Sequence, residues 1–289
     1  MAPKVSVVIP LYNHEKFIAE ALRGIIDQSE KNIEIIIVDD GSKDNSKEVV
    51  AKIAEVDSRI QYFYQENKGA HVAINNGIKR STGEFVMILN SDDVYVLNRI
   101  AKILSIFHDV PKVDAVFTGI FFIDGESKKI ENNWYQVAKE YFFKSKDLIE
   151  SSINGNFFMT TSNLFIRRTV FSEIGCFNNL RYAHDLDFFL RLFVFDKNVY
   201  YLDEPLLYYR THGNNTISES ALKVKIEWAM VTAWFLIDYA KRHNMASETE
   251  KSRIEKIHTV LDKHNLEKYV QLFVQFGNSL SNSSEYYDK

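Results

Sequence analysis

The chain of 289 residues has few of the features that mark secreted, membrane or nucleic-acid-binding proteins. Its single cysteine, Cys176, cannot form an intrachain disulfide, which fits a reducing cytosol. A net charge of −4 leaves no broad basic surface for nucleic acid. The longest apolar-rich segment, 228–240, contains Asp238 and is too short to span a bilayer, and Pro3 and Lys4 lead into a strand pattern in place of a signal peptide. We therefore expect a soluble cytoplasmic protein, with peripheral contact at the inner face of a membrane left open.

Glycine-rich phosphate-binding loops are also missing. The loop after the first apolar run, 10–14, has neither the G-x-G-x-x-G pattern of dinucleotide-binding folds nor the G-x-x-x-x-G-K-[ST] pattern of P-loop ATPases. The glycine-rich basic loop of a sugar-phosphate nucleotidyltransferase is absent as well. A response-regulator receiver, at roughly 120 residues, would leave the second half of the chain unexplained.

The first hundred residues alternate apolar strand patterns with segments of helical periodicity, which predicts a parallel sheet with helices between its strands. The predicted strands are 5–9, halted by Pro10, then 33–38, 60–64 and 85–89. The predicted helices are 17–26, from Asp44 to Val56, and from the turn at 67–69 to about Lys79.

Two pairs of adjacent acids, Asp39-Asp40 and Asp92-Asp93, follow strands of this sheet. Parallel strands bring their carboxyl ends to one edge, where ligands bind in open α/β sheets. Adjacent carboxylates repel each other unless a cation or a hydrogen-bonding ligand offsets the repulsion. A nucleotide base held by one pair and a metal-bound diphosphate held by the other would account for both. The alternative for each pair is a solvated turn with a helix-capping Asp.

Five short motifs occur in an order that resembles family 2 glycosyltransferases with the GT-A fold. They are VSVVIPLYN at 5–13, IVDDGS at 37–42, NSDD at 90–93, GCFN at 175–178 and HDLDFFLR at 184–191. The resemblance implies a Rossmann-like α/β mixed sheet flanked by helices. It also implies metal-dependent transfer of a sugar with inversion at the anomeric carbon. The donor would be a nucleotide diphosphate sugar, with a UDP-sugar preferred. The acceptor would be a hydroxyl of a glycan, lipid-linked or protein-linked molecule. The rival interpretation is a non-catalytic subunit that binds nucleotide-sugar or glycan within an assembly complex.

The resemblance also implies a set of site residues. Asp185 would be the catalytic base, a role typically worth about 10²–10⁴-fold in rate. Asp93, Asp92 and His212 would hold Mn²⁺ or Mg²⁺, which stabilises the leaving diphosphate. Asp40 would read uracil. The donor-binding residues as a whole are Pro10, Leu11, Tyr12, Asn13, Asp40, Asn67, Lys68, Asn75, Asn90, Ser91 and Asp92.

Three positions depart from the family pattern. Asn90 stands where many members have Asp, which leaves one carboxylate fewer for the metal. His184 replaces the Glu that commonly precedes the base and, when protonated, would lower the basicity of Asp185. Ile74 takes the place of a frequent Arg, so a phosphate contact would come from Lys68 or from elsewhere. Asp185 also has a structural alternative, as the cap of a helix predicted at 187–195.

The second half is expected to form the acceptor side. The predicted strands are 113–122, 162–166, 199–202 and 206–209. The segment 131–158 is rich in aromatic residues without clear periodicity; these either stack on a sugar or, as is commoner, pack in the core. They are Trp134, Tyr135, Tyr141 and Phe142. His212 either completes the metal site or hydrogen-bonds the backbone of its own loop.

From residue 221 on, the pattern is helical only, with apolar residues recurring at three- and four-residue spacing up to 276. We expect a GT-A domain at 1–220, divided into a nucleotide-sugar half (1–112) and an acceptor half (113–220). A helical extension at 221–278 and a disordered tail at 279–289 would follow. The extension would pack on its own domain and mediate homo-oligomer formation; it lacks the basic face of membrane-surface helices.

Overall fold

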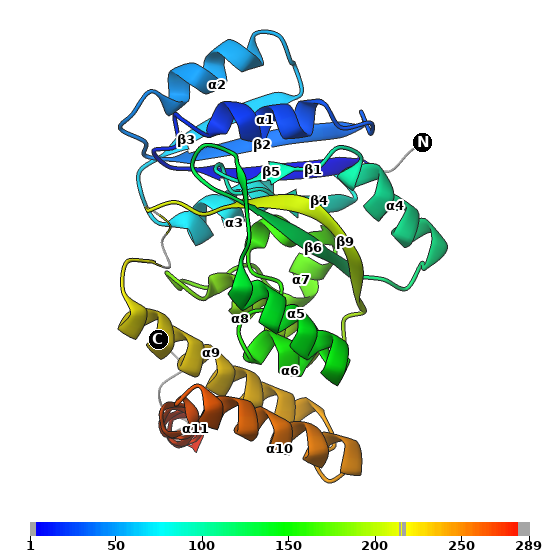
Figure 1. Cartoon of the computed structure of the whole chain (residues 1–289), viewed down its shortest axis with the longest axis vertical. Coiled ribbons are helices and arrows are strands. Elements are labelled where there is room, and N and C mark those ends of the chain that lie inside the picture. Colours follow the sequence, from blue (N-terminus) through cyan, green and yellow to red (C-terminus); the bar gives the residue numbers. More distant parts are fainter. Residues whose placement is uncertain (1–3, 214, 216–217, 283–289) are drawn as a thin grey trace. The chain divides into compact units, whose positions relative to one another are not determined.

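The computed structural model describes residues 4–213, 215 and 218–282 (Figure 1). These residues form two compact units. The first contains the chain up to Glu131, Phe158–Arg181 and Lys197–Gly213, and the second contains Asn132–Phe157, Tyr182–Asp196 and the chain after Gly213. This division differs from the expected boundary at residue 220, because two internal segments join the C-terminal helices in the second unit.

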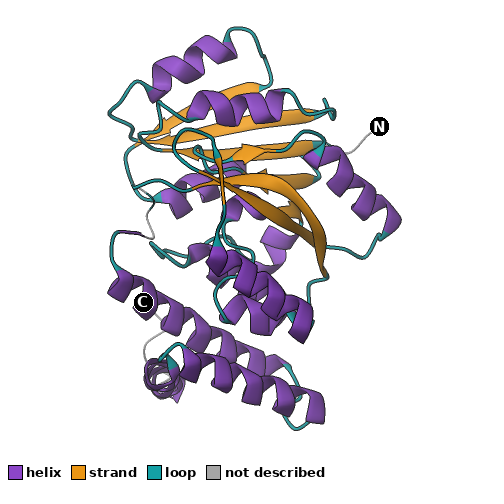
Figure 2. Ribbon diagram, viewed as in Figure 1, coloured by secondary structure: helices purple, strands orange, loops and turns teal. Residues whose placement is uncertain are grey.

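The first unit is built on one twisted mixed sheet with helices on either side (Figure 2). The strands lie in the order β3-β2-β1-β4-β8-β6-β9-β5, with β7 paired to β6. The first four strands in the chain are parallel, whereas β8 is antiparallel to both β4 and β6. The strand bounds are β1 Val5–Leu11, β2 Ile33–Asp40, β3 Ile60–Gln65, β4 Phe85–Ile88, β5 Val94–Tyr95, β6 Ala115–Ile123, β7 Lys129–Ile130, β8 Phe165–Arg167 and β9 Val199–Arg210.

Continuous apolar runs explain why the first strands form the centre of the core. Every residue of β1, β2 and β4 is buried, as expected for parallel strands covered on both faces. Gly77 lies so close to Val8 that an added Cβ would come within 2.2 Å of the valine side chain. The helices of this unit are α1 Ile18–Ile26, α2 Ser46–Ala54, α3 Ala70–Arg80, α4 Arg99–Asp109 and α7 Val170–Ile174.

The prediction that Pro10 halts the first strand is wrong, because β1 continues through Pro10 to Leu11. On one side Pro10 pairs with Val38 of β2. On the other side the ladder with β4 ends at the Val8–Ile88 pair. A proline without an N–H is tolerated where a strand has lost one neighbour. The second strand is also longer than predicted, so that Asp39 and Asp40 are its last two residues.

Two strands of the second half also differ from the prediction. Segments 199–202 and 206–209 form one strand, β9, because an irregularity in its register opposite Gly119 accommodates Pro205 within the pairing to β6. The predicted strand 162–166 begins as a 3₁₀ turn, η1 (Thr161–Asn163), and only then enters β8.

The described part of the second unit consists of helices. They are α5 Asn133–Ser145, α6 Leu148–Ile153, α8 His184–Val194, α9 Ala221–Arg242, α10 Glu248–Lys263 and α11 Glu267–Asn282. Within this unit α8 packs against α6 and α9, and α11 packs against α9. None of the helices described is long and apolar enough to cross a membrane.

Helices α5 and α6 occupy the segment that shows no periodicity in the sequence. Side-chain caps mark their starts, since Asn132 accepts a hydrogen bond from the N–H of Tyr135 and Asp147 accepts two at the start of α6. The aromatic residues of this segment differ in burial. Tyr135 is buried with its ring parallel to Phe157, whereas Trp134 is 47% exposed.

The predicted disordered tail, 279–289, overlaps the end of α11, which continues to Asn282. The remainder, 283–289, lies outside the described residues.

Candidate active site

Three side chains of types that can bind a metal ion meet at the carboxyl edge of the sheet in the first unit. His14 lies in the loop after β1, Asp92 follows β4, and His212 follows β9. One ligand atom from each lies within 4.8 Å of the other two, and Nε2 of His212 is 3.0 Å from Oδ2 of Asp92. Two imidazoles and a carboxylate form a donor set that suits a divalent transition metal.

The two histidine rings of this cluster are held by their neighbours. Phe17 stacks on His212 with 5.0 Å between ring centroids, and His14 meets Phe17 edge-on. Nδ1 of His14 lies 2.8 Å from the hydroxyl of buried Ser91, which leaves Nε2 as the nitrogen available to a cation. Burial lowers the pKa of His14, which favours the neutral ring that binds metals.

Asp93, predicted as a metal ligand, is placed differently. Its side chain is fully buried, its Oδ2 accepts a hydrogen bond from the Ser162 hydroxyl at 2.6 Å, and its Oδ1 accepts one from the Arg210 N–H at 2.9 Å. Burial and the charge of Asp92 raise the pKa of Asp93 well above its usual value. Asp93 thus joins the end of β4 to η1 and β9. Its role as a metal ligand stays a prediction.

Arg210 organises the backbone around this cluster, although its side chain is fully buried. Its Nε donates to the carbonyl of Asp92 at 2.7 Å, and its Nη1 donates to the carbonyl of Asp124 at 2.9 Å. Nη2 pairs with Glu20 at 2.6 Å, and the guanidinium lies over the ring of Phe17. A buried guanidinium with this many partners fixes the loops that it joins.

The second acid pair ties together the ends of β2 and β3. Asp40 accepts hydrogen bonds from the Gln65 amide at 2.7 Å and from the N–H groups of Lys68 and Gly69, each at 2.8 Å. Asp39 accepts one from the hydroxyl of Tyr62 at 2.6 Å. Both acids are buried, so Asp40 shapes the turn at 67–69 whatever else it binds.

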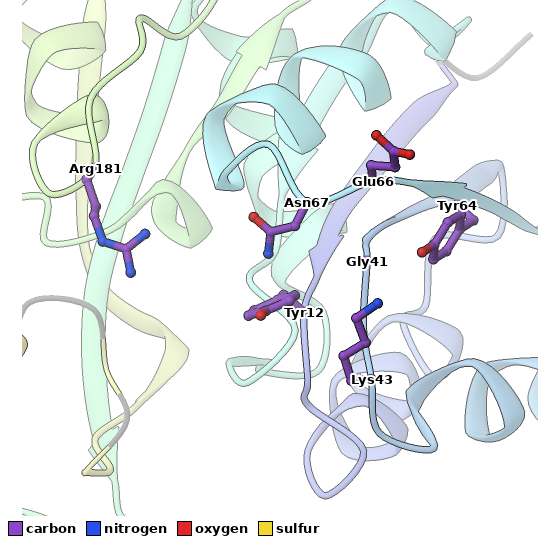
Figure 3. A pocket seen from close by; sticks show the side chains of 7 residues that line it. All are labelled: Tyr12, Gly41, Lys43, Tyr64, Glu66, Asn67 and Arg181. Carbon is purple, nitrogen blue, oxygen red and sulfur yellow. The ribbon is translucent and has the colours of Figure 1, made fainter.

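An open cavity of about 380 Å³ lies at the same edge of the sheet. Figure 3 shows Tyr12 and Asn67 on its wall, with the guanidinium of Arg181 extending toward them. Tyr12 and Asn67 belong to the predicted donor-binding set, whereas Pro10 and Leu11 are buried in β1 and Lys68 is not on the wall. The lining residues are Tyr12, Gly41, Lys43, Tyr64, Glu66, Asn67 and Arg181.

Three predicted donor-binding residues make structural contacts. Asn13 has a left-handed backbone (φ 51°) and accepts a hydrogen bond from the N–H of Lys43 at 2.7 Å. The amide of Asn75 both donates to and accepts from the backbone of Phe177. Asn90 bonds the hydroxyl of Thr160 through its Nδ2 at 3.0 Å. These residues hold the loops of the edge in place.

Asp185 belongs to the second unit, in the first turn of α8. The helix begins at His184, three residues before the predicted start, so that Asp185 lies inside the helix and is not its N-cap. Its Oδ1 accepts from the N–H of Leu186 at 2.7 Å, and its Oδ2 accepts from Nδ2 of Asn156 at 2.9 Å. Burial raises the pKa of Asp185, and His184 and these two hydrogen bonds oppose that rise.

Four further residues of this edge, which the sequence analysis does not single out, lie in the cluster or on the cavity wall: His14, Lys43, Tyr64 and Arg181. A signal for His14 was present, since it ends the loop after the first strand, at the edge where both acid pairs were expected. Arg181 and Tyr64 carried no such signal, because the sequence does not reveal which side chains turn toward the cavity.

Comparison with known proteins agrees with this geometry. The sequence model of Glycosyl transferase family 2 matches residues 6–175. An uncharacterized glycosyltransferase of Rickettsia typhi is 32% identical over 249 residues, which cover 83% of this chain and 74% of that protein. Glycosyltransferase GlyG of Streptococcus pneumoniae is 31% identical over 226 residues, with 74% of this chain and 73% of that protein covered.

Solved structures show the same fold at lower identity. S. aureus TarS 1-349 in complex with UDP-GlcNAc has a TM-score of 0.67 and 19% identity, covering 90% of this chain and 72% of that one. The mannosyltransferase PcManGT from Pyrobaculum calidifontis, in complex with GDP-Man and Mn²⁺, has a TM-score of 0.64 and 17% identity, covering 96% and 76%. The expected GT-A fold and glycosyltransferase activity are therefore confirmed. The chain belongs to glycosyltransferase family 2.

Proposed function

We propose that this glycosyltransferase transfers a sugar from a UDP-sugar to an acceptor hydroxyl, with inversion at the anomeric carbon and with a divalent cation bound at the carboxyl edge of the sheet. One observation carries the proposal. The metal-ligating cluster and the open cavity share the loop after β1, which supplies His14 to the first and Tyr12 to the second. A nucleotide in the cavity and a metal-bound diphosphate beside it would use both parts of that loop.

The cavity supports a nucleotide diphosphate as the ligand. Tyr12 and Tyr64 offer aromatic faces to a base, and Lys43 and Arg181 offer positive charge to phosphates. Ile74 stands where the family frequently has Arg, and it is uncharged and completely buried. A cationic side chain elsewhere would therefore have to supply the phosphate contact. TarS binds UDP-GlcNAc and PcManGT binds GDP-Man, as their structures are described, so uridine and guanosine are the two donor classes to compare.

His14, Asp92 and His212 would hold the cation, and their chemistry favours Mn²⁺ over Mg²⁺. Mg²⁺ prefers oxygen ligands, whereas imidazole nitrogen is accepted by softer divalent metals. A bound cation supplies charge stabilisation to the departing diphosphate.

Asp185 is proposed as the base. As the acceptor oxygen attacks the anomeric carbon and the bond from that carbon to the diphosphate oxygen breaks, Asp185 takes the hydroxyl proton. A carboxylate whose pKa is raised by burial is a stronger base than an exposed one, provided that it is ionised. The acceptor is proposed to be a hydroxyl on a glycan or on a lipid- or protein-linked saccharide.

A donor screen tests the proposal. Release of nucleoside diphosphate is measured from UDP-glucose, UDP-galactose, UDP-GlcNAc and GDP-mannose with Mn²⁺, with Mg²⁺ and with EDTA. We expect turnover of a UDP-sugar that is highest with Mn²⁺ and is lost with EDTA. Turnover of GDP-mannose alone would contradict the donor class, and full turnover in EDTA would contradict the role of the cation. UDP binding without turnover of any donor, with saccharide acceptors present, would favour the non-catalytic subunit.

Self-association through the C-terminal helices is proposed as well. Exposed apolar side chains on α9 and α11 support it; they are Leu222, Ile226, Trp234, Leu272 and Phe276. Light scattering at increasing concentration tests it, and a constant monomer mass would contradict it.

A further inference from the structure

The two residues before α8 are held by a side chain of another helix. A helix start leaves backbone N–H groups without intrahelical partners, and Ala183, at the N-cap position of α8, has no side-chain oxygen that could accept from the first turn. Glu227 of α9 fixes the backbone just before that turn. Its Oε2 accepts from the N–H of Tyr182 at 2.7 Å and from the N–H of Ala183 at 2.9 Å. A carboxylate at this end also suits the helix dipole.

The side chain of Asp185 is fixed separately, from the end of α6. Asn156 has a left-handed backbone (φ 51°), which asparagine tolerates better than most residues, and its N–H donates to the carbonyl of Ser152 at 2.6 Å. This anchored residue directs Nδ2 at Oδ2 of Asp185, while the N–H of Leu186 bonds Oδ1. Both carboxylate oxygens therefore have defined directions.

We infer that Asn156 and Glu227 are positioning residues that hold Asp185 for proton transfer. The inference rests on the proposed role of Asp185 as the base. Glu227 fixes the backbone at the start of α8, and Asn156 fixes the carboxylate and stabilises its ionised form. Through Glu227, α9 would help to hold the proposed base in place.

This arrangement predicts how the rate depends on pH. Burial raises the pKa of Asp185, and the hydrogen bond from Asn156 opposes that rise. Other titratable side chains near this helix start also bear on the pH dependence. They include His184 on α8 itself, Glu150 on α6 and Glu227 on α9, the two helices that pack against α8. Removing the amide donor would raise the pKa of Asp185 further, so that the base becomes active only at higher pH.

Two substitutions test Asn156. Asn156→Gly keeps the left-handed backbone and removes the amide, and Asn156→Asp keeps the shape but places a second carboxylate beside Asp185. We expect the acidic limb of the rate profile for UDP release from a UDP-sugar to move up by about one pH unit in Asn156→Gly and further in Asn156→Asp. On the acidic limb itself, the rate of Asn156→Gly should be about 10-fold below that of wild type at the same pH, with KM for the donor unchanged. A purely structural role would lower the melting temperature without moving the limb.

Two substitutions of similar size test Glu227. Glu227→Gln keeps an acceptor oxygen and should retain most of the rate, whereas Glu227→Met has no acceptor and should lose about 10-fold in kcat. Glu255→Met makes the same change at an exposed position on α10 and should change nothing. Calorimetric affinity for UDP should be equal in all three variants.

Asp185→Asn, measured in parallel, separates the two proposals. If Asp185→Asn keeps the wild-type rate, Asp185 is not the base and the inference falls with it. If Asp185→Asn loses the rate while Asn156→Gly and Glu227→Met keep the wild-type kcat and pH profile, only the positioning inference is overturned.

A second readout needs no turnover. The difference in unfolding free energy between the wild-type chain and the Asp185→Asn variant depends on pH, and that dependence reports the pKa of Asp185. We then measure the same difference with Asn156→Gly present in both chains. The pH at which the difference in unfolding free energy changes should be higher in this pair. An unmoved curve contradicts the inference.

Discussion

The hydroxyl of Ser91 lies 2.8 Å from Nδ1 of His14, on the ring whose other nitrogen is available to the cation. Groups that orient a metal-binding imidazole typically contribute about 10–100-fold to affinity. We therefore expect Ser91→Ala to weaken Mn²⁺ binding by about 10–100-fold, and His14→Ala or His212→Ala to weaken it more. Calorimetric titration of Mn²⁺ in the presence of UDP measures this. Equal affinity for Mn²⁺ in wild type and His14→Ala would show that His14 does not bind the cation.

Asp93 is expected to stabilise the fold. In Asp93→Ala the Ser162 hydroxyl and the Arg210 N–H lose their buried acceptor, which should cost about 1–3 kcal/mol in the free energy of unfolding. Urea unfolding of the cation-free chain measures this, with Asp92→Ala as the control at the neighbouring position. If Asp93→Ala unfolds like wild type and no longer binds Mn²⁺, Asp93 is a ligand, as the family resemblance implied.

Arg181 is expected to contact the donor phosphates. Arg181→Ala should weaken UDP binding about 10-fold and leave uridine binding unchanged, because a guanidinium bonds phosphate oxygens more strongly than neutral groups. Lys52→Ala, which changes an exposed cation on α2 that does not line the cavity, is the control. An equal loss of affinity for uridine and UDP would mean that Arg181 shapes the base pocket.

Asp185→Asn should lower the transfer rate without destabilising the fold. The proton acceptor is lost, so transfer should fall by about 10²–10⁴-fold at unchanged UDP affinity. Because burial raises the pKa of Asp185, the ionised carboxylate is a cost to the folded state at neutral pH, and its replacement should leave the melting temperature equal or higher. A lower melting temperature together with a near-normal rate would assign Asp185 a structural role only.

Glu34, far from this chemistry, should control stability in acid. Burial favours its protonated form, but hydrogen bonds led by those from Ser6, Lys4 and Thr82 lower its pKa from 4.5 to about 2. A depressed pKa stabilises the fold above pH 4.5, and this contribution is lost as the pH falls toward 2. Glu34→Gln should therefore cost about 1–3 kcal/mol at pH 7, less as the pH falls through 2, and almost nothing well below that pH. Exposed Glu126→Gln is the control, and a cost that does not depend on pH would contradict the assignment.

Strands β1 to β4 and the shared edge of the two acid pairs could be predicted from the sequence, because continuous apolar runs and adjacent carboxylates are local signals. The end of β1 could not, since the tolerance for Pro10 depends on where β4 stops pairing. The hydrogen bonds of Asp93 and Asn75 were equally hidden. Their partners, Ser162 and Phe177, are distant in sequence, and only the folded chain shows that a motif residue faces inward.

The cluster of His14, Asp92 and His212 would also make cation binding depend on how much of the chain has been synthesised. Asp92 and His212 are 120 residues apart, and His212 follows β9, whose last residue, Arg210, holds the backbone of Asp92. A nascent chain that ends at residue 112 contains β1 to β4 but neither Arg210 nor His212. The cation would therefore bind the completed sheet and stabilise it, by mass action, over any form in which β9 has not yet docked. Addition of Mn²⁺ should accordingly protect β9 from proteolysis as strongly as it protects the loops that bind the ion.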